Sequence, residues 1–75
     1  MTDLRLFHTE GCHLCELAQA LLDEQQLSYQ LVDICDHAES LEKYKIRIPV
    51  LTKGDAELGW PFDQASLTEF LEANQ

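Results

Sequence analysis

The chain has 75 residues, enough for one small domain with a modest hydrophobic core. Apolar residues make up 45% of it and charged residues 25%, the proportions of a folded globular chain, so disorder is not expected. The formal net charge of -9 argues against nucleic acid and anionic membranes as partners, because both bind basic surfaces. No apolar run approaches transmembrane length and the first residues lack the pattern of a signal peptide, so we expect a cytoplasmic protein.

The chain contains three cysteines, Cys12, Cys15 and Cys35, which cannot all pair with one another. In a small cytoplasmic protein, a Cys-x-x-Cys pair indicates redox or metal chemistry rather than a framework of structural disulfides. These two chemistries are therefore the first candidates for the function.

The first half of the chain predicts a strand, a helix and a second strand. The segment Leu4–Phe7 is short and apolar apart from Arg5, which is typical of a central strand. Apolar residues recur at helical spacing from about His13 to Gln26, and β-branched and aromatic residues favour a strand over Ser28–Ile34. Two strands joined by a helix form a βαβ unit, in which the strands are parallel and the crossover is right-handed. The apolar helix residues are Leu14, Leu17, Ala18, Leu21 and Leu22.

The second half predicts a helix, a hairpin and a last helix. Asp36 and Glu39 fit a capping box that opens a helix running to about Lys45. This helix is expected to bury Ala38, Leu41 and Tyr44. A strand is predicted over Ile46–Thr52, entered through Pro49, and a short strand over Ala56–Leu58 pairs back with it as a hairpin. The last predicted element is a helix over about residues 64–73, capped by Asp63. Its inward-facing residues are Leu67, Phe70 and Leu71.

The stretch Thr9–Cys15 lies where the first strand gives way to the first helix. At the start of a helix, unpaired amide groups and the positive end of the helix dipole favour an anion. That anion would be the thiolate of Cys12, because the thiolate rather than the thiol attacks disulfides. Cys15 follows one turn later on the same face, where it could close a disulfide or release a mixed one.

With a Gly-Cys-His-Leu-Cys start at residues 11–15 and Ile-Arg-Ile-Pro-Val-Leu at residues 46–51, the chain resembles the small glutaredoxin-like proteins of the thioredoxin-fold superfamily. The resemblance covers essentially the whole chain. It implies a single domain over residues 1–75 with an α/β, thioredoxin-like fold. The implied element order is βαβ-α-ββα, with a four-stranded mixed sheet flanked by three helices. It also implies a thiol–disulfide oxidoreductase of cell redox homeostasis.

The resemblance assigns the chemistry to the two cysteines, with Cys12 as nucleophile and Cys15 as resolving thiol. It further implies that the Ile48–Pro49 bond is cis and lies beside them, so that an extended substrate could pair with the backbone edge at Ile48. Without the resemblance, Pro49 could simply begin an edge strand, where its missing N–H does no harm. The charged form of His13 could support the thiolate, or the side chain could merely be solvated.

Three further residues are candidate substrate contacts. By resemblance, Lys45 and Arg47 lie near the carboxylate ends of a bound thiol tripeptide, and Asp63 lies in the segment that holds the amino end of glutathione. The alternative for the two cations is a solvated helix end, where positive charge complements the dipole. The alternative for Asp63 is its role as a helix cap.

The sequence also departs from the family pattern near both ends of the expected glutathione site. Thr9 stands where many glutaredoxins have lysine, and Glu10 adds a negative charge that should raise the pKa of Cys12. Pro61 removes a backbone donor, and Phe62 replaces a small polar residue. We therefore expect glutathione to be a possible co-substrate only.

No metal or organic cofactor is required for the predicted chemistry. The expected partners are a disulfide-containing protein or a small thiol, together with a reductase or glutathione as electron donor, and we expect a monomer. One alternative is a metal-binding module, with zinc held by Cys12, Cys15, Cys35 and His37 or an iron–sulfur cluster shared between chains. The other is a redox-inert interaction domain, because a fold does not fix an activity. Cys35 itself could be a third redox thiol, a route to a covalent dimer or a packing residue.

Overall fold

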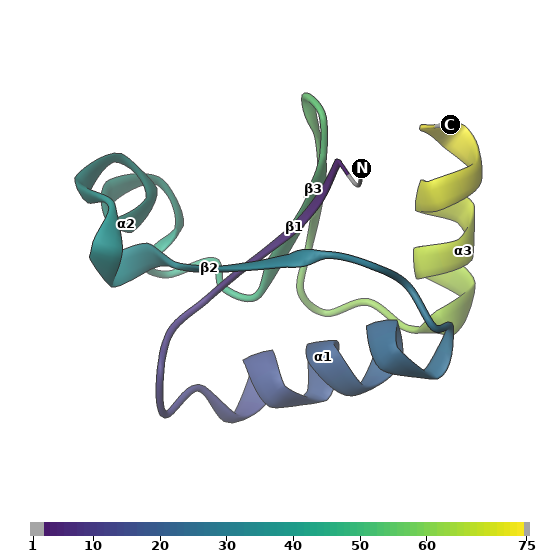
Figure 1. Ribbon diagram of the computed structural model, residues 1–75, viewed down its shortest axis with the longest axis horizontal. Helices are drawn as coiled ribbons and strands as arrows, with labels where there is room; N and C mark the ends of the chain where they lie inside the picture. The colour runs from purple at the N-terminus through teal and green to yellow at the C-terminus, as the bar shows by residue number, and fades with distance from the viewer. Residues whose placement is uncertain (1–2, 75) are drawn as a thin grey trace.

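The structure, a computed structural model, describes residues 3–74. Figure 1 shows the chain from the first strand to the last helix. Its elements are β1 (Leu4–His8), α1 (His13–Glu24), β2 (Gln30–Asp33), the 3-10 helix η1 (Ile34–Asp36), α2 (Ala38–Tyr44), β3 (Val50–Lys53), β4 (Ala56–Gly59) and α3 (Gln64–Ala73). This order confirms the predicted α/β arrangement of four strands and three α-helices, to which η1 is added.

The four strands form one mixed sheet in the order β2-β1-β3-β4. β1 is parallel to β2 and antiparallel to β3, so that Leu6 lies opposite Leu31 on one side and Leu51 on the other. β3 and β4 form the predicted hairpin. The βαβ unit and the hairpin therefore both follow the sequence prediction.

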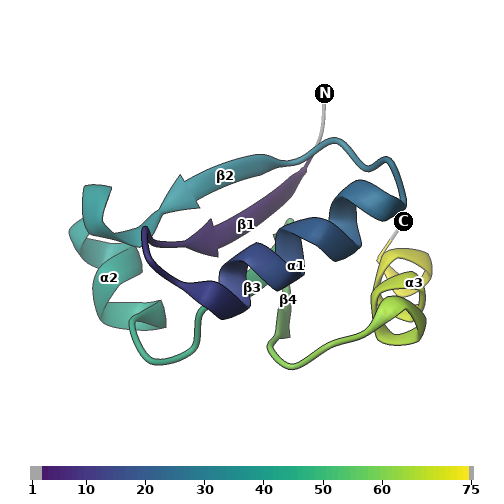
Figure 2. The same ribbon diagram turned by 90° about the horizontal axis from the view of Figure 1, so that it is seen from below.

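The main core lies between one face of the sheet and the helices α1 and α3. Side chains alternate along a strand, so Leu4 and Leu6 point to this face while Arg5 and Phe7 point to the other. Figure 2 shows α1 lying across the strands, with α2 and α3 at opposite sides of the molecule. The buried residues of this core are Leu4, Leu6, Ala18, Leu22, Leu51, Phe62, Leu67 and Phe70.

A second, smaller cluster lies on the other face of the sheet, at the end next to α2. Ile34, Tyr44 and Val50 are buried there, and Phe7 and Ile48 pack against them. The rings of Phe7 and Tyr44 have centroids 4.6 Å apart. Because α2 is short, it covers only this end of the sheet. The rest of that face is left open.

The start of α2 differs from the prediction. Asp36 does not cap the helix but lies in η1, and the N-cap of α2 is His37, which makes no side-chain capping bond. The cause is local: the Asp33 carboxylate accepts a hydrogen bond from the Cys35 amide at 2.9 Å and opens the 3-10 turn earlier. The helix therefore begins one residue later than the expected capping box implies.

The burial predicted for α2 is also wrong in part. Ala38 and Leu41 are exposed, and only Tyr44 is buried. The third strand likewise begins at Val50 rather than Ile46, because the amides of Arg47 and Ile48 both donate to the Tyr44 carbonyl and close a turn. Residues 46–48 thus form a loop at the end of the sheet.

None of the helices within residues 3–74 has the length and apolar character needed to cross a membrane.

Candidate active site

The two cysteines of the Cys-x-x-Cys pair lie at the junction of β1 and α1. Gly11 turns the chain between the two elements with a φ of 78°, a left-handed conformation that a side chain would strain. Cys12 is the N-cap of α1, and its Sγ accepts a hydrogen bond from the Cys15 amide at 3.2 Å. In effect, the sulfur occupies the place of a capping oxygen.

The two sulfurs differ in their access to solvent. Cys12 is half-buried, whereas Cys15 has only 1% of its surface exposed. The structure joins them in a disulfide with a Cα–Cα distance of 5.2 Å. After reduction, the same Cys15 amide and the helix dipole would favour a thiolate on Cys12. The arrangement therefore gives one accessible sulfur and one buried sulfur that can reach it.

The loop that enters β3 lies at the same end of the sheet. Phe7 is paired with Val50, so Pro49 follows the antiparallel ladder to the level of His8, just before the cysteine loop. The Ile48–Pro49 peptide bond is cis, Pro49 is buried, and its carbonyl accepts from the Trp60 amide at 3.2 Å. In both ribbon views this loop and the start of α1 lie toward the same end of the molecule, the end at which α2 is found (Figures 1 and 2).

His13 is the first residue of α1 and lies in solvent. Its side chain is 80% exposed, and its Nδ1 lies 3.8 Å from a carboxylate oxygen of Glu16. The imidazole therefore lies close to an acidic side chain of the first helical turn. Its place directly after Cys12 keeps it as a candidate residue of the site.

The two predicted cationic contacts have different surroundings. Arg47 donates to Glu57 on β4 with a nitrogen–oxygen distance of 3.0 Å, and Lys43 approaches the same carboxylate at 3.2 Å. The Tyr44 hydroxyl also donates to it at 2.6 Å. These bonds lower the pKa of Glu57 to about 2, and the bond from Tyr44 has the largest effect.

Arg47 thus links the loop before β3 to the hairpin, while its side chain stays 44% exposed and its role toward a substrate stays a prediction. Lys45 follows α2 as its C-cap and is exposed. The sequence could not reveal the carboxylate that binds Arg47, because Glu57 lies ten residues away and reaches it only through the hairpin.

The family model of the Glutaredoxin-like domain (DUF836) matches residues 3–72, nearly the whole chain. The chain belongs to the glutaredoxin-like domain family. A comparison with curated proteins gave no match.

Solved structures agree with this assignment. The X-ray structure of the structural-genomics target XcR50 from X. campestris is 35% identical, with a TM-score of 0.87 over 96% of this chain and 99% of that one. The solution structure of Ne2328 from Nitrosomonas europaea is 28% identical, with a TM-score of 0.75 over 92% and 89%.

A glutaredoxin from Archaeoglobus fulgidus shares the fold at 17% identity, with a TM-score of 0.69 over 95% of this chain and 87% of that one. These neighbours confirm the α/β, thioredoxin-like fold of this glutaredoxin-like protein.

Asp63 has a structural role in this glutaredoxin-like protein. It is the N-cap of α3, and its Oδ1 accepts a hydrogen bond from the Ser66 amide at 2.8 Å. That bond lowers the pKa of the Asp63 carboxyl. The predicted capping role is therefore confirmed, and its role toward a substrate stays a prediction. The adjacent Trp60–Pro61 bond is cis, and Phe62 is buried in the main core.

Cys35 is a free, exposed thiol in η1, at the carboxyl end of β2. Its Sγ lies 3.4 Å from the Thr9 hydroxyl, so the loops after the two parallel strands touch. Within residues 3–74, no three His, Cys, Asp or Glu side chains are arranged to hold a metal ion. Nothing in this part of the chain therefore supports a preformed zinc site.

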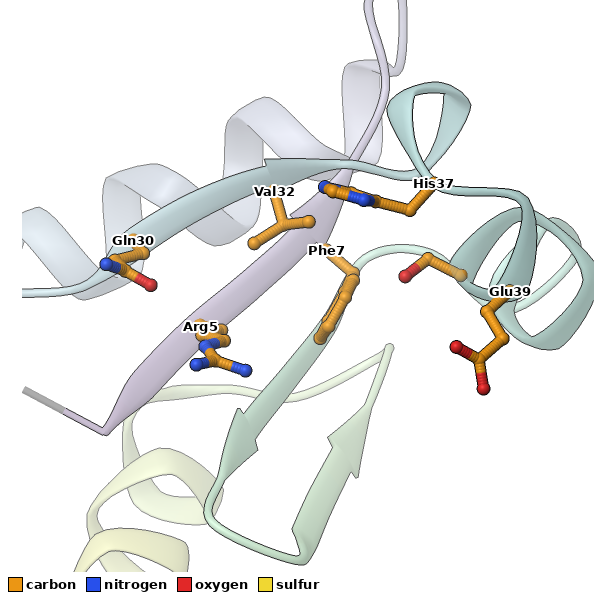
Figure 3. Close-up of a pocket in the computed structure, with 7 residues that line it drawn as sticks. Arg5, Phe7, Gln30, Val32, His37 and Glu39 are labelled. Carbon is orange, nitrogen blue, oxygen red and sulfur yellow. The ribbon is translucent and has the colours of Figure 1, made fainter.

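A hollow of about 370 Å³ lies on the open face of the sheet, away from α1 (Figure 3). It is lined by Arg5, Phe7, Gln30, Val32, His37, Glu39 and Ser40. Sequence reasoning did not anticipate it, although the alternation along β1 could have placed Arg5 and Phe7 on one face. The hollow contains neither cysteine of the pair, so it is separate from the candidate active site.

Proposed function

We propose that this glutaredoxin-like protein is a cytoplasmic thiol–disulfide oxidoreductase in which Cys12 is the nucleophile and Cys15 the resolving thiol. One observation carries the proposal: the accessible Cys12 sulfur sits at the N-cap of α1 under the Cys15 amide, beside a buried partner sulfur. A helix N-terminus is where a cysteine thiolate is stabilised. The substrates are disulfides of proteins or small thiols, which fits a role in redox homeostasis.

The reaction is a two-step exchange that balances sulfur by sulfur. The Cys12 thiolate attacks one sulfur of the substrate disulfide, a mixed disulfide forms, and the other substrate sulfur leaves as a thiolate that takes up a proton. The deprotonated Cys15 then attacks Cys12 Sγ, the second substrate thiol leaves, and the Cys12–Cys15 disulfide remains. Two electrons pass from the protein dithiol to the substrate, and a reductase or glutathione returns them.

The roles of the two cysteines can be separated by trapping. With a disulfide substrate, Cys15→Ser is expected to accumulate the mixed disulfide, because the release step is lost. Cys12→Ser should trap nothing, since Cys15 is buried and cannot meet a substrate. Both variants are made with Cys35→Ser as a background, so that the exposed third thiol does not react instead. Intact-mass spectrometry under non-reducing conditions measures the adducts.

A mixed disulfide on Cys12→Ser equal to that on Cys15→Ser would contradict the assignment of the nucleophile. No adduct on either variant, and no oxidation of the wild-type dithiol by any disulfide, would support the redox-inert alternative. Running the wild-type protein with a glutathione system and with a thioredoxin-reductase system identifies the electron donor.

A further inference from the structure

The hollow on the open face of the sheet is built on two neighbouring positions of the parallel strands β1 and β2. Arg5 lies opposite Gln30, and Phe7 lies opposite Val32. Side chains two residues apart on a strand point to the same face, so a polar pair and an apolar pair lie next to each other on this face. The start of α2 supplies the remaining wall.

The charged side chains of this hollow have no partner among residues 3–74. In this part of the chain Arg5 forms no ion pair, whereas Arg47 binds Glu57. Glu39, in the first turn of α2, likewise forms no ion pair there. His37 is the N-cap of α2, but its side chain makes no capping bond. A guanidinium and a carboxylate thus line one hollow without neutralising each other.

The other charged groups near Arg5 lie toward the hairpin. Asp55 and the ion pair of Lys43 with Glu57 line the adjoining hollow, and Asp3 lines a further hollow together with Arg5. These acids oppose the binding of a multiply charged anion. They favour a ligand that carries a single carboxylate and a positive group of its own.

The order of the side chains along the hollow indicates the length of such a ligand. Figure 3 shows Arg5 and Gln30 at one end, Phe7 and Val32 in the middle, and Glu39 at the other end. Two residues along a strand span roughly 7 Å, so the charged ends are too far apart for the amino and carboxyl groups of one amino acid. An extended tripeptide spans about 10 Å. The volume of about 370 Å³ also lies in the range of small-molecule sites.

We propose that this hollow binds a short peptide with free ends, about three residues long and with an apolar side chain in the middle. Arg5 and the Gln30 amide donate to the carboxylate of the peptide, and Glu39 accepts from its ammonium group. The middle side chain packs on Phe7 and Val32. Since neither cysteine of the pair lines the hollow, this binding is independent of the function proposed above.

The test uses four tripeptides without cysteine, so that thiol exchange plays no part in the measurement. They are Gly-Leu-Gly with free ends, its C-terminal amide, its N-acetylated form, and Gly-Ser-Gly with free ends. Each is titrated into the oxidised, ¹⁵N-labelled protein, and the amide shifts of Phe7, Val32 and Ser40 measure binding. Gly-Leu-Gly with free ends should bind most tightly, and each change to it should raise Kd about five- to tenfold.

Two variants assign the ends of the peptide to the protein. Arg5→Gln should abolish the difference between the free and amidated peptides, and Glu39→Gln the difference between the free and acetylated ones. Both residues are exposed, so the fold should persist, which the dispersion of the spectra checks. Lys53→Gln and Glu69→Gln are the matched controls and should bind like the wild type. Lys53 lies opposite Leu4 and hence on the other face of the sheet, and Glu69 is an exposed residue of α3.

Three outcomes would overturn the inference. The first is the lack of any saturable shift at the hollow with Gly-Leu-Gly. The second is equal binding of the free, amidated and acetylated peptides, because the charged ends would then not be recognised. The third is a loss of binding with Lys53→Gln or Glu69→Gln as large as that with Arg5→Gln or Glu39→Gln. None of these outcomes bears on the exchange reaction of Cys12.

Discussion

Replacing Glu57 by glutamine tests how the loop around Arg47 is held in place. The Glu57 carboxylate on β4 accepts from Tyr44 at 2.6 Å and from Arg47 at 3.0 Å, and lies 3.2 Å from the Lys43 ammonium. It therefore links the end of α2 and the loop before β3 to the hairpin. Glutamine keeps the size of the side chain but removes the charge that draws these donors together.

The expected magnitude follows from the pKa of Glu57, which these bonds lower from 4.5 to about 2. A tenfold change in proton affinity corresponds to about 1.4 kcal/mol, so the upper limit is about 3 kcal/mol. The Glu57 side chain is 26% exposed, and solvent weakens ion pairs at such sites. We therefore expect Glu57→Gln to lower the free energy of unfolding by about 1–2 kcal/mol at neutral pH.

The direction of the pKa shift decides how the stability difference between Glu57→Gln and wild type changes with pH. Because the folded-state pKa is depressed, the stabilisation is complete above the ordinary value of 4.5 and is lost as the pH falls toward about 2. Urea denaturation of wild type and variant, from about pH 7 to about pH 3, should show the difference shrinking at the acid end. Glu42→Gln, an exposed change on α2, is the control and should be nearly neutral.

Equal stability of Glu57→Gln and wild type at neutral pH would refute this reasoning. So would a difference that stays constant into the acid range, because the loss would then not come from the ionised carboxylate.

Four further outcomes are expected from single substitutions. Gly11→Ala should cost about 1 kcal/mol in urea denaturation because of the φ of 78°, while Gly59→Ala, with an open site and no positive φ, should not; equal costs would contradict this. Leu51→Ala, at a side chain with no exposed surface, should lose about 2–5 kcal/mol by the same measurement, and a loss below about 1 kcal/mol would contradict the core described. Asp63→Ala should lower the melting temperature at neutral pH, and Asp63→Ser should lower it much less, because serine can also cap a helix. The difference in melting temperature between the wild type and Asp63→Ala should fade as the pH falls through the lowered pKa of Asp63. Cys35→Ser should leave the rate of dithiol oxidation unchanged, and a large decrease would make Cys35 part of the reaction.

The order and pairing of the elements could be predicted because they depend on patterns within short segments. Buried positions such as Ala18 and Leu22 recur at helical spacing, and one βαβ unit fixes the parallel pair. The start of α3 could likewise be predicted from the sequence, because the cap at Asp63 involves residues only three apart.

Other features depend on which of several chemically similar residues makes a given contact. Asp33 and Asp36 are both good capping residues, and the structure uses Asp33 for a 3-10 turn, which the sequence alone does not indicate. The partner of Arg47 could not be predicted either, because several carboxylates are available and only the hairpin register selects Glu57. The exposure of Ile46 has a similar origin: the turn at the Tyr44 carbonyl keeps residues 46–48 out of β3, which begins only at Val50.

These long-range contacts bear on the chemistry of the site. Arg47 lies two residues before Pro49, where a free guanidinium could bind the carboxylate of a small anionic thiol. The ion pair with Glu57 instead uses that charge to hold the loop against the hairpin. Next to Arg47, Ile46 is 91% exposed, and Lys45 is exposed as well, so an apolar and a cationic side chain both remain accessible on this loop. The turn at the Tyr44 carbonyl and the ion pair with Glu57 therefore fix the loop that leads into Pro49, and the contacts of this loop with a substrate stay a prediction.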